Sequence, residues 1–165
     1  MNLEYSAADQ AFRAEVRELT PEQMRFRPGT EANTINFLVW HWARVEDGIV
    51  HNNIGASRPT IWQAGQWDSR LGVEENASGT GFNGEQVGAF QPDRDELLAY
   101  FRAVWEESDA AIAMLTEADL DRVLNPERPQ MTLGRSVQSL LIGHGFWHLG
   151  EVRFLKGLQG MPFSR

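Results

Sequence analysis

Two histidines lie four residues apart in a run of mostly apolar and small residues near the C-terminus, SLLIGHGFWHLGEVRFLKG. Residues at this spacing point the same way from a helix, so His144 and His148 share one face. Two imidazoles placed in this way can bind one divalent ion at about 2.1 Å. A third histidine, His41, lies on the inward stripe of an earlier helical segment. Three inward histidines on two helices favour a metal site.

The alternative is an ordinary core. A single histidine on an apolar face is more often a core residue whose ring nitrogens bond to protein groups. Three neutral imidazoles buried together would leave several ring nitrogens without partners, at about 1–3 kcal/mol each. A divalent ion takes up these lone pairs. The fourth histidine, His51, falls about 80° off the face of His41, at a helix end, where we expect a capping or surface role.

Two charged residues near the histidines could contribute to the chemistry. Glu151 follows His148 by three residues on the same stripe. It could be a fourth ligand, an acceptor for an imidazole N–H or a base for metal-bound water; a surface carboxylate fits equally. Arg44 follows His41 by one turn and could hold an anionic substrate group, or pair with Glu46 or Asp47. The sequence does not identify a catalytic residue.

Four long helices are expected to position these side chains. Apolar residues at spacings of three and four predict helices over 6–19, 33–50, 93–115 and 133–157. Ser6, Thr20, Asp93, Thr116 and Thr132 are the expected caps. Residues 51–92 are rich in Gly, Pro, Asn and Ser, and we expect an ordered excursion with helical turns at TIWQAG and GEQVGAF.

The predicted fold class is all-α, because no stretch alternates with period two. The architecture is a four-helix bundle with a long connection between its second and third helices. Such a connection lets the third helix run parallel to the second. The expected order is therefore up-down-down-up.

Composition limits the class of protein. The length of 165 residues suits a single domain over 1–165, and 42% apolar residues suffice for a core. The net charge of −8 argues against nucleic acid and anionic membranes as partners. The absence of cysteine excludes disulfides, thiolate ligands and a cysteine nucleophile. We see no signal peptide and no membrane-spanning stretch, so a cytoplasmic protein is expected.

Three segments resemble the DinB-like (YfiT-like) metalloenzyme superfamily: FLVWHWARVED, GTGFNGEQVGAF and HGFWHLGEVRFLKG. The resemblance extends over nearly the whole chain. It implies an up-down-down-up bundle with one divalent metal, commonly nickel, zinc or iron, bound by His41, His144 and His148. The remaining coordination positions would hold water or substrate. It also implies a homodimer. Glu151 stands where glutamine is common, which adds negative charge near the metal.

Characterised members of that superfamily are often thiol transferases or isomerases that use bacillithiol, mycothiol or glutathione. A divalent ion held by neutral imidazoles can lower the pKa of bound water toward about 7, or bind a thiol as thiolate. This chain has no cysteine, so the thiol must be an external, low-molecular-weight one. We expect a thiol S-transferase-like enzyme with a small-molecule substrate. A metal-dependent hydrolase, a non-catalytic metal-binding bundle and a purely structural bundle are the alternatives.

Overall fold

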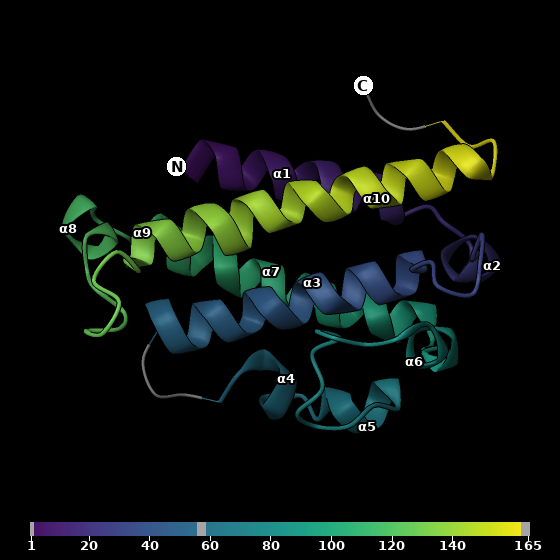
Figure 1. Ribbon diagram of the computed structural model, residues 1–165, viewed down its shortest axis with the longest axis horizontal. Helices are drawn as coiled ribbons and strands as arrows, with labels where there is room; N and C mark the ends of the chain where they lie inside the picture. The colour runs from purple at the N-terminus through teal and green to yellow at the C-terminus, as the bar shows by residue number, and fades with distance from the viewer. Residues whose placement is uncertain (1, 56–58, 163–165) are drawn as a thin grey trace.

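The computed structural model describes residues 2–55 and 59–162 (Figure 1). Its long helices are α1 (Asn2–Val16), α3 (Ile35–Ile49), α7 (Arg94–Ala113) and α10 (His144–Leu158). The connections contain the short helices α2 (Pro21–Arg25), α4 (Ile61–Ala64), α5 (Trp67–Leu71), α6 (Gly84–Ala89), α8 (Glu117–Leu120) and α9 (Leu133–Ser136). Two π-helical segments, η1 (Val50–Ile54) and η2 (Val137–Gly143), extend α3 and precede α10.

The predicted all-α class is confirmed. Across the described ranges no strand forms, and Val123 pairs with Thr132 in an isolated antiparallel bridge. None of the described helices is long and apolar enough to cross a bilayer. The cytoplasmic location stays a prediction.

The four long helices lie side by side (Figure 1). α3 packs against both α7 and α10, and α1 packs against α10 and α7. In Figure 1 the chain runs from left to right along α1 and α10, and from right to left along α3 and α7. The neighbouring helices α3 and α10 therefore run in opposite directions.

Buried apolar side chains of the described residues form two clusters. The larger one joins the long helices to the excursion, and its largest fully buried members are Trp40, Trp42, Trp62, Tyr100 and Phe12. The smaller one lies where α3, α7, α9 and η2 meet and contains Ile49, Ile112, Leu133, Val137, Leu141 and Ile142. Both clusters contain residues of α3, which is buried along most of its length.

The predicted caps are confirmed at Thr20, Asp93, Thr116 and Thr132. The first helix is different: α1 begins at Asn2, so Ser6 lies inside it and is not its cap. It also ends at Val16 rather than Leu19. The chain after Val16 turns more tightly than an α-helix, because Leu19 N–H donates to the Val16 carbonyl at 3.2 Å. Thr20 then takes an extended backbone, with φ −74° and ψ 161°, to cap α2.

The last predicted helix, over 133–157, is helical as expected, but its middle is not an α-helix. Residues Val137–Gly143 are π-helical and lead directly into His144. The apolar spacing of this stretch gives no sign of the change. π-helical turns are rare and occur frequently at functional sites.

Lys156 and Glu15 fix α10 against α1. The ammonium group of Lys156 donates to the Glu15 carboxylate and, at 3.1 Å, to the Glu15 carbonyl. Arg153 donates to the other carboxylate oxygen at 3.0 Å. Because Glu15 and Lys156 are both buried, this ion pair sets where α10 lies along α1.

Asp47 holds the excursion on the bundle. One of its carboxylate oxygens accepts from the backbone N–H of Ile61 at 3.0 Å. The other accepts from Trp62 N–H at 2.8 Å and from the Tyr100 hydroxyl at 3.1 Å. The turns predicted at TIWQAG and GEQVGAF are confirmed as α4 and α6, so over 59–92 the excursion is ordered.

Candidate metal centre

His41 from α3 and His144 and His148 from α10 come together in the structure. One ring nitrogen from each lies within 4.8 Å of the others. The ring centroid of His41 is 5.2 Å from each of the other two rings, with interplanar angles of 81° and 82°. The centroids of His144 and His148 are 4.3 Å apart. The three predicted residues therefore form one cluster that could bind an ion.

A main-chain carbonyl of the excursion fixes the orientation of His41. The Nδ1 of His41 lies 2.6 Å from the Ser78 carbonyl oxygen, so Nδ1–H donates and Nε2 carries the lone pair. The Phe37 ring stacks on this imidazole at 5.7 Å with an interplanar angle of 4°. His41 retains 9% exposure. It is thus held in a form that can offer Nε2 to an ion.

Glu151 fixes His148 in the same way. The Nδ1 of His148 donates to a Glu151 oxygen at 2.5 Å, and Asn33 donates to the other oxygen at 3.1 Å. The Nε2 of His148 then carries a lone pair and lies 2.9 Å from Nε2 of His144. Carboxylates that accept from the outer N–H of a metal-ligating imidazole set its tautomer and orientation. Of the three roles considered for Glu151, this contact supports the hydrogen-bond acceptor.

The Nε2 atoms of His144 and His148 face each other at 2.9 Å. Two lone pairs at this distance repel unless a proton or a cation lies between them. Without an ion, His144 Nε2–H can donate to His148, and the buried Nδ1 of His144 then has no hydrogen-bond partner among the described residues. A divalent ion would instead accept one lone pair from each of the three imidazoles.

Burial favours the neutral forms of His41 and His144. Burial, and after it the neighbouring His148 and His41, lower the pKa of His144 from 6.5 to about 4. Burial also lowers the pKa of His41, although the hydrogen bond to Ser78 acts in the opposite direction. A metal binds the neutral imidazole, so both shifts preserve the binding form at neutral pH.

Glu151 stays ionised beside these rings. Burial raises its pKa, but the hydrogen bond and charge of His148 and the hydrogen bond from Asn33 outweigh burial and lower the pKa overall. A carboxylate that accepts a hydrogen bond from the candidate ligand His148 adds negative charge to the site. It strengthens the imidazole as a donor to a cation.

Arg44 and His51 have structural contacts instead. Arg44 donates to the Ala77 carbonyl at 3.0 Å, covers the Trp62 ring at 4.3 Å and lies 3.9 Å from an Asp47 oxygen. The predicted pairing with Asp47 is therefore observed, and no contact among the described residues supports the anion-binding role. His51 is buried and lies 2.9 Å from the Asp47 carbonyl. The expected surface position of His51 is wrong, whereas its contact with a helix-end carbonyl agrees with a capping role.

Two further contributors, Ser78 and Asn33, could not be predicted from the sequence. Ser78 acts through its main-chain carbonyl, so its residue type carried no signal. Asn33 precedes α3 and reaches Glu151 only after α3 and α10 have packed together. A polar residue just before a histidine-bearing helix is the only sign that could have indicated it.

A model of the DinB superfamily matches residues 4–152, a span that contains the three clustered histidines and Glu151. The chain belongs to the DinB superfamily. A crystal structure titled as a conserved protein of a locus from Enterococcus faecalis shares this DinB fold, with a TM-score of 0.81 and 16% identity. The alignment covers 95% of this chain and 93% of that chain, and at this identity it shows the fold alone. No curated protein sequence matches the chain.

We expect Glu151→Gln to weaken zinc binding about tenfold, because the amide keeps an oxygen acceptor for His148 but loses the charge that polarises the ring. Competition with a chromophoric zinc chelator at constant pH measures this affinity. Glu85→Gln, at an exposed position of α6, is the matched control. An unchanged affinity in Glu151→Gln would show that the charge of Glu151 does not contribute to metal binding.

Proposed function

We propose that this DinB protein is a divalent-metal-dependent enzyme of the thiol S-transferase type, built on an up-down-down-up four-helix bundle. The observation that carries the proposal is the cluster of three imidazoles from α3 and α10, with one ring nitrogen from each within 4.8 Å of the others and the Nε2 atoms of His144 and His148 2.9 Å apart. The opposite directions of α3 and α10 in Figure 1 support the bundle order.

His41, His144 and His148 would hold the ion. Imidazole ligands suit zinc, nickel and iron. Such an ion, when bound, supplies a Lewis acid that lowers the pKa of a coordinated thiol or water. Glu151 keeps His148 in its Nδ1–H form, and Ser78 does the same for His41. The chain has no cysteine, so a low-molecular-weight thiol would come from solution.

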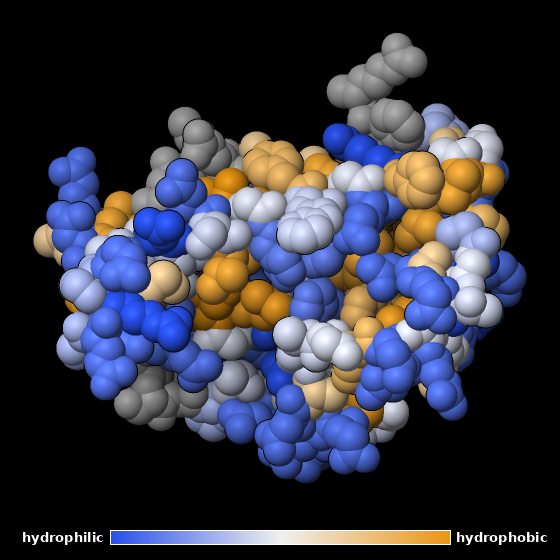
Figure 2. All heavy atoms as spheres, viewed as in Figure 1, coloured by the Kyte–Doolittle hydropathy of each residue, from blue (hydrophilic) through white to orange (hydrophobic). Residues whose placement is uncertain are grey.

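The outer face of α10 supports the proposed homodimer. Phe146, Trp147, Phe154 and Leu158 are exposed there. Figure 2 shows apolar side chains reaching the surface along this helix. Gly150 and Gly157 lie between them, and a Cβ at either glycine would meet open space. Exposed apolar patches rimmed by polar residues typically mark interaction sites.

Elemental analysis of protein purified without a metal-affinity tag tests the metal site. We expect about one zinc, nickel or iron per chain, because the three ligands define a single site. His148→Ala should lose the ion. His51→Gln, which changes the histidine outside the cluster, should keep it. Absence of metal from the wild type, before and after incubation with zinc or nickel, would exclude the proposed site.

A screen of thiols and electrophiles on the metal-loaded protein then separates the candidate functions. Turnover that requires an added thiol supports the transferase. Turnover of esters or amides without a thiol points to the hydrolase that uses the same site. A loaded protein without either activity points to the non-catalytic metal-binding bundle.

A further inference from the structure

Residues 75–82, here called the strap, cross α3 at the level of His41. Three of the strap's main-chain carbonyls accept hydrogen bonds from side chains of α3 and α4. The donors are Trp62 to Glu75 at 2.8 Å, Arg44 to Ala77 at 3.0 Å and His41 to Ser78 at 2.6 Å. The strap is therefore attached to the bundle at successive points, and the last of them is a candidate metal ligand.

Gly79 lets the strap approach this closely. Its φ of +85° lies in the left-handed region, which favours glycine. A Cβ at this position would lie 2.9 Å from Phe37 Cε2, 3.0 Å from Trp40 Cζ3 and 3.1 Å from His41 Nδ1. These distances are too short for carbon contacts, so any side chain would push the strap away from His41.

Gly81, two residues further on, shows which effect comes from the backbone conformation and which from the lack of space for a Cβ. Its φ of +78° also lies in the left-handed region. A Cβ there would meet nothing within 4 Å. At Gly81 only the left-handed backbone favours glycine. At Gly79 both the left-handed backbone and the nearness of His41 favour glycine.

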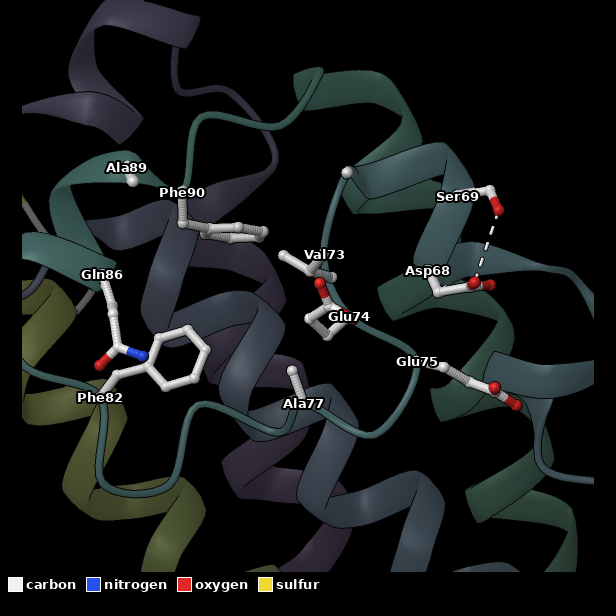
Figure 3. A pocket seen from close by; sticks show the side chains of 11 residues that line it. Asp68, Ser69, Val73, Glu74, Glu75, Ala77, Phe82, Gln86, Ala89 and Phe90 are labelled. Carbon is white, nitrogen blue, oxygen red and sulfur yellow. Dashed lines mark hydrogen bonds between the residues drawn. The ribbon is translucent and has the colours of Figure 1, made fainter.

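The other side of the strap borders a cavity of about 590 Å³, lined in part by Ala77 and Phe82 (Figure 3). The Phe82 ring also lies 6.0 Å from Phe37 and 5.7 Å from Trp40. The strap thus packs against α3 on one side and borders the cavity on the other. Its position depends on the inner contacts, where the space beside Gly79 would not accept a Cβ.

We propose that the strap is the positioning element of the metal site and that Gly79 is its positioning residue. The Ser78 carbonyl holds His41 as the Nδ1–H tautomer, with Nε2 directed at the ion. Gly79 keeps that carbonyl within reach. This inference rests on the proposed metal site and assigns to the excursion the orientation of one of its ligands.

Zinc affinity of Gly79→Ala and Gly81→Ala, measured by chelator competition beside the wild type, tests the inference. Both substitutions incur the cost of a left-handed backbone, so both should lose stability, and Gly79→Ala should lose more because its Cβ also overlaps Phe37, Trp40 and His41. Only Gly79→Ala should weaken zinc binding, about 10–100-fold, as loss of a ligand's supporting hydrogen bond does. Cobalt loaded into the same proteins should show an altered visible spectrum for Gly79→Ala alone.

Two results would overturn the inference in distinguishable ways. Equal zinc affinities for Gly79→Ala and Gly81→Ala, with a wild type that binds, overturn the role of the strap and leave the metal site standing. A wild type that binds no zinc overturns both. If Gly79→Ala does not fold, nitrogen NMR of the metal-free wild type decides: His41 should be the Nδ1–H tautomer, and the Nε2–H tautomer contradicts the proposal.

Discussion

Asp47→Ala is expected to lower the free energy of unfolding by about 3–5 kcal/mol, because it removes a fully buried carboxylate and leaves its partners buried. Asp47 has 0% exposure. Its loss would strand the backbone N–H groups of Ile61 and Trp62 and the hydroxyl of Tyr100. Burial, and after it the nearby Asp47 charge, raises the pKa of Tyr100, so this hydroxyl stays a neutral donor.

Urea denaturation followed by circular dichroism measures the change. Asp68→Ala, at a partly exposed position of α5, is the matched control and should cost far less. Limited proteolysis of Asp47→Ala should cut first within 59–92, the segment that Asp47 holds. A loss near that of the control would mean that the carboxylate does not hold the excursion.

Zinc is expected to stabilise the metal-free protein at pH 7 by about 4 kcal/mol when free zinc is 1,000 times its Kd. The physical reason is that the folded chain brings together three ligands that the unfolded chain keeps apart. Urea denaturation with and without zinc measures the increment. His148→Ala should show little of it, and an equal increment in wild type and His148→Ala would contradict the site.

The increment should shrink as the pH falls, because protons compete with zinc for the ring nitrogens. The metal-free protein should also lose stability. The folded pKa of His144, about 4, lies below the ordinary value of 6.5. The unfolded chain therefore takes up this proton first, and His144 contributes stability that is present above pH 6.5 and lost as the pH falls toward 4. The free energies of unfolding with and without zinc must therefore be compared at the same pH, separately for each pH.

How far the sequence predicts the site depends on how far apart in the sequence the contacting residues lie. His144 and His148 were predictable because helical geometry alone fixes residues four apart. His41 required the further inference that its stripe faces the core, and the packing of α3 on α10 agrees with it. The contacts of Ser78 and Asn33 lay beyond reach, because they depend on how distant segments pack.

The fold shows the same difference between local features, which the sequence predicts, and features that depend on packing. Caps at Thr20, Asp93, Thr116 and Thr132 are local, and the sequence predicts them. The start of α1 was missed because a cap-like residue, Ser6, also occurs inside a helix. The π-helical turns of Val137–Gly143 were missed because their apolar spacing resembles that of an α-helix. Such features are set by packing rather than by the local pattern.

The division of the ligands between α3 and α10 also fixes an order in time. His144 and His148 lie on one helix, which can form in about a microsecond. His41 joins them only when α3 packs on α10, and α4 to α9 come between these helices along the chain. A chain in which α10 has formed without packing on α3 would offer an ion only two of the three histidines. Full ligation would therefore depend on a contact between segments distant in sequence, which forms slowly.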